Sequence, residues 1–189
     1  MITSFCTLKY YIKCDLFRYT SNISAKSFLR AWLIPGFRFT FYLRLAQYAM
    51  KYPVIKWAFI MRLRHYQFKY GISIHYTSNI GPGLYIGHFG GIIVNPNVRI
   101  GSNVNLSPNI LLGQNLNKSN NKFEYPVIGD RVYIANGAKV IGGVVIGNDA
   151  IIGINTLVTH DVNENEVVVG QPAKVISYEG SGKLVGSYL

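Results

Sequence analysis

The fold of this chain is decided by residues 79–110, which read NIGPGLYIGHFGGIIVNPNVRIGSNVNLSPNI. An aliphatic residue stands at every sixth position, and the series continues on both sides of the stretch. Its first run is Ile74, Ile80, Ile86, Ile92, Val98, Val104 and Ile110, and its second is Ile128, Ile134, Val140, Ile146, Ile152 and Val158. The gap between the two runs is a multiple of six, so the repeat resumes in phase after an interruption.

This period fits neither an α-helix, which repeats about every 3.6 residues, nor a strand, which repeats every ~2. It fits a chain that turns a corner every six residues, so that three short strands close a triangular coil of about eighteen. Glycine after many of the aliphatic residues, as in Ile86-Gly87, suits tight corners. We predict about five coils from Ser73 to around Val162, with aliphatic residues stacked inside on those about eighteen positions away.

The segments outside the repeat are predicted to flank a mostly β protein. Residues 1–70 lack the repeat and show helical spacing over residues 24–31 and 38–50, with Pro35-Gly36 and Pro53 as breaks. They predict a small helical N-terminal region packed on or beside the first coil. The coil domain is assigned to residues 71–178, with the Asn- and Lys-rich residues 114–125 as an outward loop, and residues 179–189 as a tail.

Charge is unevenly distributed between these regions. The net charge is +11, and the first 70 residues carry twelve Lys or Arg against one acid, Asp15, together with 18 of the 26 aromatic residues. Such a basic, aromatic region favours contact with an anionic surface, such as a membrane or an acidic or lipid-linked glycan. The interleaving of aliphatic and aromatic residues in this region favours interface or core packing over nucleic-acid binding.

Composition also points to a compartment. Cys6 and Cys14 lack the spacing of a zinc site or a redox motif, and they are expected to be free thiols in a reducing cytoplasm. Lys9, Lys13 and Asp15 interrupt every apolar run that could serve as a signal peptide. Basic residues recurring through residues 31–61 argue against a spanning helix. We expect a cytoplasmic protein, with the inner face of the membrane as a candidate peripheral site.

Three motifs carry a resemblance to a known family. They are Ile86-Gly87-His88-Phe89-Gly90-Gly91-Ile92, Ile134-Ala135-Asn136-Gly137-Ala138-Lys139 and Val169-Gly170-Gln171-Pro172-Ala173-Lys174-Val175-Ile176. Together with the repeat, they resemble the hexapeptide-repeat acyltransferases, and within these the serine O-acetyltransferase-like branch that includes capsular and exopolysaccharide acetyltransferases. The resemblance covers residues 72–177. It implies a left-handed parallel β-helix, a homotrimer with active sites between subunits, and acetyl-CoA as acyl donor.

The resemblance also implies roles for individual residues. His88 matches the family's catalytic histidine, and imidazole is a suitable general base for activating an alcohol near neutral pH. Gly113, Asn136 and Ile154 would line the pantetheine of acetyl-CoA, and Lys139 or Lys174 would meet its phosphates; solvated surface positions are the simpler alternative for the two lysines. No metal is expected.

Several positions depart from the pattern of the serine enzymes. Ser73 stands where an aspartate is expected to orient the histidine, and His75 is a second supporting candidate. Gly87 replaces an aspartate before the catalytic histidine, and Glu124-Tyr125 replace an arginine-histidine pair on the outward loop. Because Glu124 would repel an amino-acid carboxylate, the sequence favours a sugar hydroxyl as acceptor. Tyr125 would stack on the sugar, with Asn115, Asn117, Asn120 and Asn121 as hydrogen-bonding partners or simply a flexible polar loop.

The leading prediction is therefore an acetyl-CoA-dependent O-acetyltransferase of a capsular polysaccharide, an exopolysaccharide or its lipid- or nucleotide-linked precursor. Serine O-acetyltransferase of cysteine biosynthesis is the first alternative, and a noncatalytic β-helix scaffold is the second. A γ-type carbonic anhydrase would need three histidines converging on zinc. The remaining histidines, His65, His75 and His160, are not spaced by about eighteen residues from His88 or from one another, which argues against that class.

Overall fold

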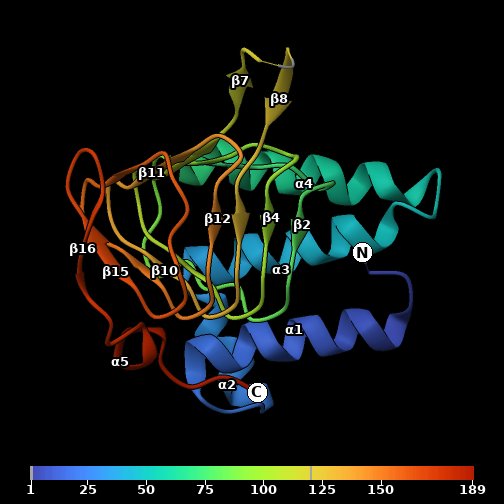
Figure 1. The fold of residues 1–189 in the computed structure, drawn as a ribbon. Helices are drawn as coiled ribbons and strands as arrows, with labels where there is room; N and C mark the ends of the chain where they lie inside the picture. Colours follow the sequence, from blue (N-terminus) through green and yellow to red (C-terminus); the bar gives the residue numbers. More distant parts are fainter. Residues whose placement is uncertain (1, 120) are drawn as a thin grey trace.

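The structure is a computed structural model that describes residues 2–119 and 121–189. Four helices come first in the chain and a coil of short parallel strands follows (Figure 1). The helices are α1 (Phe5–Thr20), α2 (Ala25–Trp32), α3 (Pro35–Ala49) and α4 (Ile55–Tyr70), and a single turn, α5 (Gly182–Val185), lies near the C-terminus. Among the described residues, no helix combines the length and hydrophobicity that crossing a membrane requires.

The coil has three faces, each a sheet of parallel strands. Sheet 1 contains β1 (Ile72–Ile74), β3 (Ile92–Val94), β6 (Leu111–Gly113), β11 (Lys139–Ile141) and β14 (Leu157–Val158). Sheet 2 contains β5 (Asn105–Leu106), β10 (Tyr133–Ile134), β13 (Ile151–Ile152), β15 (Val167–Val169) and the antiparallel β16 (Lys174–Ser177). Sheet 3 contains β2 (Asn79–Ile80), β4 (Arg99–Ile100), β9 (Val127–Ile128) and β12 (Val145–Ile146). Five successive coils result, as the repeat predicted.

The aliphatic repeat fills the inside of the coil, but its stacking differs from the predicted spacing. All thirteen aliphatic residues of the two runs are buried. However, Ile74 pairs with Val94, not with a residue eighteen positions away, because the first coil contains two extra residues. The hairpin insertion likewise pairs Leu111 with Lys139. The residues added by the two insertions together number a multiple of six. The six-residue repeat therefore stays in phase along the sequence, although each insertion changes which residue stacks on which.

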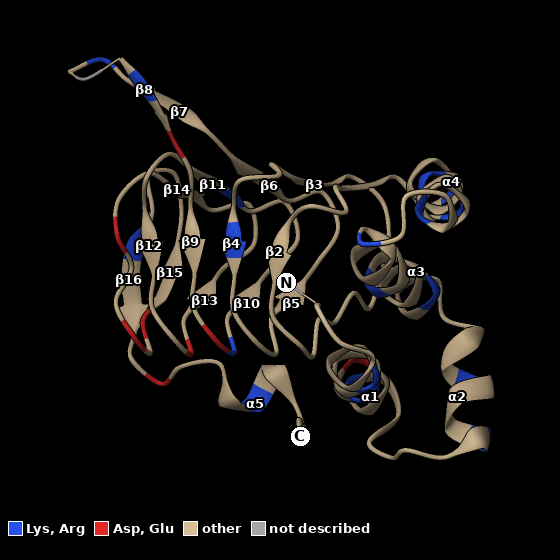
Figure 2. Ribbon diagram, turned by 90° about the vertical axis from the view of Figure 1, so that its right-hand side faces the viewer, with Lys and Arg blue, Asp and Glu red and all other residues tan. Residues whose placement is uncertain are grey.

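The interruption between residues 110 and 128 contains a β-hairpin. Strands β7 (Asn115–Asn117) and β8 (Lys122–Glu124) pair antiparallel, and the hairpin projects from the coil in Figures 1 and 2. The predicted outward loop therefore carries regular structure of its own. Phe123, near its tip, is 54% exposed, so the hairpin contributes little to the aliphatic core.

The helical region is larger than predicted. Helices α1 and α4 were not resolved by the sequence pattern, and Pro35 begins α3, where a missing N–H is tolerated, instead of only separating two helices. The structure is 32% helical, so "mostly β with a small helical region" understates the helices. Figure 2 shows α1 to α4 gathered at the end of the coil where β2 lies, with Lys or Arg on each of them.

Side chains from these helices cap the backbone of the first coil. The Gln67 side-chain amide donates to the Ile74 carbonyl at 2.7 Å, and that of Gln47 donates to the Ser78 carbonyl at 2.9 Å. Arg44 donates to the carbonyls of Ile80 and Gly81 at 2.9 and 2.6 Å. An end coil would otherwise leave such groups unpaired, and capping units are needed at the ends of repeat folds. At the other end, β16 pairs with β15.

One buried ion pair anchors the cap. Asp15 and Arg44 lie 2.9 Å apart, with 1% and 0% of their side chains exposed. The Asp15 carboxylate also accepts hydrogen bonds from the backbone of Gly83 and Leu84 at 2.8 and 2.9 Å. Through these contacts, Asp15 and Arg44 join α1 and α3 to the corner that follows β2.

Candidate functional site

His88 lies on a corner of the first coil that is longer than its counterpart in the next coil. Between the inward residues Ile86 and Ile92 lie five residues, whereas Leu106 and Ile110 are separated by three. This corner is where the two extra residues of the first coil are placed. Gly90 and Gly91 adopt φ values of +110° and +66°, which other residues rarely adopt. The expansion leaves the His88 side chain exposed.

The helical cap holds the start of this corner in place. The hydroxyl of Tyr19 on α1 accepts a hydrogen bond from the Ile86 N–H at 2.9 Å. Burial raises the pKa of Tyr19, so the hydroxyl stays neutral. On α3, Gly36 packs so closely that a Cβ there would lie 1.9 Å from the Ile86 carbonyl oxygen. Two helices therefore set the position of the residue from which the His88 corner departs.

Two adjoining cavities open beside His88, of about 220 and 550 Å³. Both are lined by His88, Ser107, Pro108, Tyr133 and Leu184. The smaller one adds Tyr85, Gly87, Asn105 and Leu106, and the larger adds Ala135, Asn136, Ile151, Gly153 and Ile154. The larger cavity thus runs from His88 along sheet 2, across successive coils. Its lining is mostly apolar, which suits the apolar part of a long, flexible ligand.

Two of the five residues predicted to bind acetyl-CoA lie with His88. Asn136 and Ile154 line the larger cavity, and Ile154 is 69% exposed. Gly113 ends β6, where its carbonyl accepts a hydrogen bond from Gly142 at 3.1 Å. Lys139 directs its ammonium group to the Gly137 carbonyl at 3.4 Å, and Lys174 begins β16. These last three do not line either cavity.

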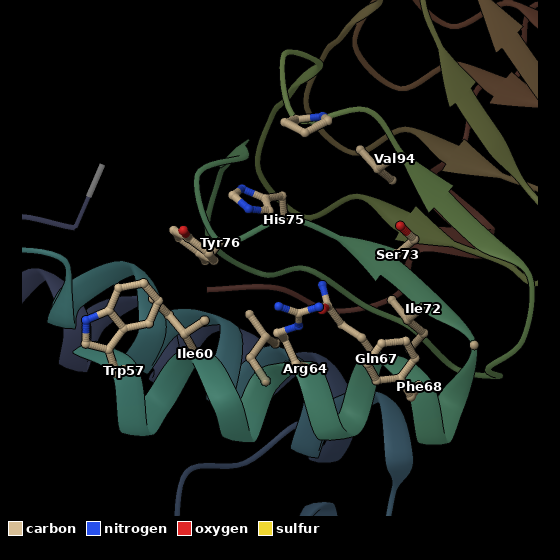
Figure 3. Close-up of a pocket in the computed structure, with 13 residues that line it drawn as sticks. Trp57, Ile60, Arg64, Gln67, Phe68, Ile72, Ser73, His75, Tyr76 and Val94 are labelled. Atoms are coloured by element: carbon tan, nitrogen blue, oxygen red, sulfur yellow. The ribbon is translucent and has the colours of Figure 1, made fainter. Parts of the chain in front are cut away.

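Ser73 and His75 do not share a cavity with His88 within the chain. They line a separate groove of about 640 Å³ between the first coil and α4, opposite Trp57, Arg64 and Gln67 (Figure 3). The His75 ring contacts the Thr77 hydroxyl at 2.7 Å, and burial lowers the pKa of His75. Among the described residues, none makes a hydrogen bond to the His88 ring.

Glu124 lies in a third place, at the base of the hairpin. Its carboxylate accepts a hydrogen bond from the Asn117 amide at 2.7 Å, across the β7–β8 pair. It also lines a cavity of about 350 Å³ with Asn115, Gly142, Gly143, His160 and Asp161 among its neighbours. Tyr125 beside it is half-buried. Asn120, one of the predicted acceptor-binding residues, lies outside the described residues.

Sequence reasoning missed the walls of the smaller cavity. Tyr85, Asn105 and Tyr133 come from strand positions that the repeat alone marks only as outward-facing. Leu184 comes from the predicted tail, which in fact folds back on the coil: Val185 is buried, and the Ser181 hydroxyl donates to the Arg131 carbonyl. Tyr85 is only three residues from His88, but the other contacts join segments far apart in sequence, so no local pattern could place them beside His88.

Among the described residues, there is no group of three or more His, Cys, Asp or Glu side chains arranged to hold a metal ion.

Comparison with known proteins finds serine acetyltransferases among the relatives of this chain. No family model matches the chain. It is 38% identical over 110 residues to a serine acetyltransferase of Staphylococcus xylosus, covering 58% of this chain and 50% of the relative. With a serine acetyltransferase of Helicobacter pylori it shares 34% over 107 residues, covering 57% and 61%. The chain thus spans about half to three fifths of the length of these curated relatives.

Solved structures of the same group extend the likeness to the helices. The structure of Neisseria gonorrhoeae serine acetyltransferase gives a TM-score of 0.75 at 24% identity, covering 92% of this chain and 68% of that one. Soybean serine acetyltransferase complexed with serine gives 0.73 at 26% identity, covering 89% and 69%. A serine acetyltransferase in complex with CoA gives 0.75 at 22% identity, covering 91% and 71%. These likenesses confirm the predicted left-handed β-helix fold.

The predicted polysaccharide acceptor is wrong. The relatives found by sequence and by structure are serine acetyltransferases, the class that was kept as the alternative. The sequence argument assumed that Glu124 would face the acceptor as a free negative charge. In the structure, Glu124 lies at the base of the hairpin, hydrogen-bonded by Asn117, and lines a different cavity from His88, so within one chain it does not face the His88 cavities.

Proposed function

We propose that this chain is a serine O-acetyltransferase that transfers the acetyl group of acetyl-CoA to the hydroxyl of L-serine, with His88 as general base. The observation that carries the proposal is the placing of His88. It stands on an expanded corner at the mouth of a cavity that follows the coil past Asn136 and Ile154. L-Serine is proposed as the acceptor because the relatives are named serine acetyltransferases.

The chemistry requires one base and no covalent enzyme intermediate. A ring nitrogen of His88 accepts the proton of the serine hydroxyl while the oxygen attacks the thioester carbonyl. The tetrahedral intermediate then collapses, the C–S bond breaks, and the imidazolium returns the proton to the departing CoA thiolate. The products are O-acetyl-L-serine and CoA. The exposed position of His88 suits this cycle, because it lines both adjoining cavities.

The donor is proposed to lie in the larger cavity. Its length along sheet 2 and its apolar lining fit a pantetheine chain, with Asn136 as a polar contact and Ile154 as an apolar one. Gly113 and the lysines Lys139 and Lys174 remain proposed contacts, the lysines for the phosphate groups. Since these residues lie outside the cavity, a second subunit would have to bring them to the same ligand.

A homotrimer is proposed for the same reason. The candidate residues fall into separate clusters within the chain: His88 with Gly87 on sheet 2, Ser73 with His75 beside α4, and Glu124 with Tyr125 at the hairpin. Active sites between subunits would let one chain's hairpin or groove face another chain's His88. Sedimentation equilibrium tests the assembly directly, with a trimer as the expected result.

The exposed side of α4 along the rim of the groove that it forms with the first coil is proposed as a peripheral membrane contact. Trp57, Met61 and Phe68 are 57%, 63% and 80% exposed, and basic residues of the same helix flank them. An apolar face with Lys and Arg beside it suits an anionic lipid surface. We expect co-sedimentation with vesicles containing phosphatidylserine but not with phosphatidylcholine vesicles, and binding to neither would reject the contact.

Thiol release from acetyl-CoA tests the activity. The purified protein should release CoA in an L-serine-dependent manner, and His88→Ala should lower kcat by about 100- to 10,000-fold, the usual contribution of a general base. His65→Ala is the matched control, because His65 is an exposed histidine on α4, away from both His88 cavities. Equal activity of wild type and His88→Ala would reject His88 as the base. No serine-dependent release by the wild type would favour the noncatalytic scaffold.

A further inference from the structure

A buried arginine without a carboxylate partner lies behind the smaller His88 cavity. Arg18, on α1, is 9% exposed. Its Nη2 donates to the Asn105 side-chain oxygen, but its Nε and Nη1 are buried and have no hydrogen-bond partner. Buried guanidinium groups normally have all their donors used, because an unpaired donor in a protein interior is costly. Two donors of Arg18 are therefore left for a group that is not part of the chain.

Arg18 likewise makes no ion pair among the described residues. Among the described residues, the ion pairs join Arg44 to Asp15 and Arg131 to Asp149. Asp15 is the acid on the same helix as Arg18, but its carboxylate is already occupied by Arg44 and by two backbone N–H groups. Burial lowers the pKa of Arg18, although an arginine stays charged at neutral pH. A buried positive charge of this kind favours the binding of an anion.

The surroundings of Arg18 connect it to the cavity. Its guanidinium lies 5.7 Å from the ring centre of Tyr85, and Asn105 accepts its hydrogen bond. Tyr85 and Asn105 both line the cavity of about 220 Å³ that contains His88. The Asn105 amide also donates to the Leu184 carbonyl at 3.3 Å. Helix α1, the second coil and the C-terminal segment thus meet at one wall of this cavity.

We propose that the smaller cavity binds the carboxylate of the acceptor, with Arg18 as its counter-charge from behind the wall that Tyr85 and Asn105 form. The inference rests on the proposed function and deepens it, because it assigns the part of the site that holds the amino acid. The division of space agrees with it: the donor occupies the larger, apolar cavity, and the compact anionic acceptor occupies the smaller one, with His88 between them.

This assignment explains how an amino-acid acceptor could bind although Glu124 stands where a positively charged residue is expected. The outward hairpin offers Glu124 where a carboxylate-binding arginine would be expected. Arg18 supplies the missing positive charge from a different part of the chain, at the base of the site, not from the hairpin. The cation is placed by the docking of α1 on the coil, which explains why the repeat region alone does not contain it.

The decisive experiment compares acceptors with and without a carboxylate. We would measure steady-state kinetics of Arg18→Met with L-serine and with L-serinamide, whose amide removes the negative charge. For L-serine, KM should rise about 10- to 100-fold, as expected for the loss of a nearby buried counter-charge. For L-serinamide, and for acetyl-CoA, KM should change by less than about threefold. Lys13→Met removes an exposed positive charge from the same helix and should change none of these values.

A second measurement separates this inference from the proposed function. Binding of L-serine and L-serinamide to wild type, Arg18→Met and Arg18→Lys is measured by titration calorimetry, without acetyl-CoA. Arg18→Lys keeps the charge and should retain part of the preference for L-serine. An inactive wild type that still prefers L-serine in an Arg18-dependent way would refute the activity but keep the carboxylate site. Equal loss of both ligands in Arg18→Met, or no loss of either, would overturn the carboxylate site itself.

Discussion

The coil and the helical cap are stabilised by different kinds of contact. Inside the coil, aliphatic side chains stack on their counterparts in neighbouring coils, and the repeat supplies the same contact many times. Where the cap meets the coil, apolar side chains of α3 and α4 join the same buried cluster, and single polar groups add specific anchors. These are Asp15, Arg44, Gln47 and Gln67, which bond to the backbone of the first coil or to each other. Damage to one stacked layer should therefore cost little, whereas damage to one anchoring group should cost much.

The site combines the two kinds of construction. The coil provides the wall along which the larger cavity runs, while the cap fixes Ile86 and places Arg18 behind the wall of the smaller cavity. A regular solenoid gives a rigid surface, but every coil presents much the same surface. A distinctive site therefore needs an irregular corner and a second region packed against the coil. The extra residues around His88 and the docked helices provide both.

Removing Asp15 should have the largest effect. Asp15→Ala leaves Arg44 buried without its carboxylate and the Gly83 and Leu84 N–H groups without an acceptor. The free energy of unfolding should fall by about 3–5 kcal/mol, as for other broken buried pairs. Urea denaturation followed by circular dichroism measures it. In the coil, Asp149→Ala breaks the partly exposed pair with Arg131 and should cost about 1 kcal/mol or less; equal costs would contradict the comparison.

Crowding the contact between α3 and the coil should come next. Gly36→Ala would put a methyl group 1.9 Å from the Ile86 carbonyl oxygen if nothing moved, so either the helix or the corner must shift. We expect a loss of about 1–3 kcal/mol in the free energy of unfolding, together with a lower kcat, because Ile86 leads into the His88 corner. Gly182→Ala is the control, since the space around it is open. An unchanged kcat would mean that α3 does not position His88.

Trimming one layer of the aliphatic column should have a smaller effect. Ile134 is fully buried, and Ile134→Val removes one methylene-sized group from the interior. We expect a loss of about 1 kcal/mol in the free energy of unfolding, measured by the same denaturation. Ile176→Val, at a position that is 63% exposed, should change it by less than about 0.5 kcal/mol. A loss as large as that of Asp15→Ala would show that the coil is as sensitive as the cap.

The hairpin tip should matter least for stability. Phe123 is 54% exposed on a hairpin that projects from the coil, so Phe123→Ala should change the free energy of unfolding by less than about 0.5 kcal/mol. Measured sedimentation of the same variant shows whether the exposed ring serves assembly. A marked loss of thermal stability together with an unchanged oligomeric state would reveal packing of the tip within its own chain.

Much of the coil was predictable because its information is local. Each Ile or Val of the repeat marks one short strand, and the residues just after it form the next corner. The period and the approximate number of coils can therefore be counted along the chain. The stacking register was harder. Two insertions, around His88 and at the hairpin, cancel in the six-residue count, and only the strand pairing shows that Ile74 lies against Val94.

The sequence by itself determined the fold class, the special position of His88 and the basic character of the N-terminal region, because each is written in neighbouring residues. Only the tertiary structure decided that Glu124 is engaged by Asn117, that the C-terminal segment returns to His88, and that Arg18 lies behind the same cavity. Apart from the Asn117–Glu124 bond within the hairpin, these contacts join residues distant along the chain, such as Arg18 and Asn105. They depend on how the helices dock on the coil, which no local pattern of residues records.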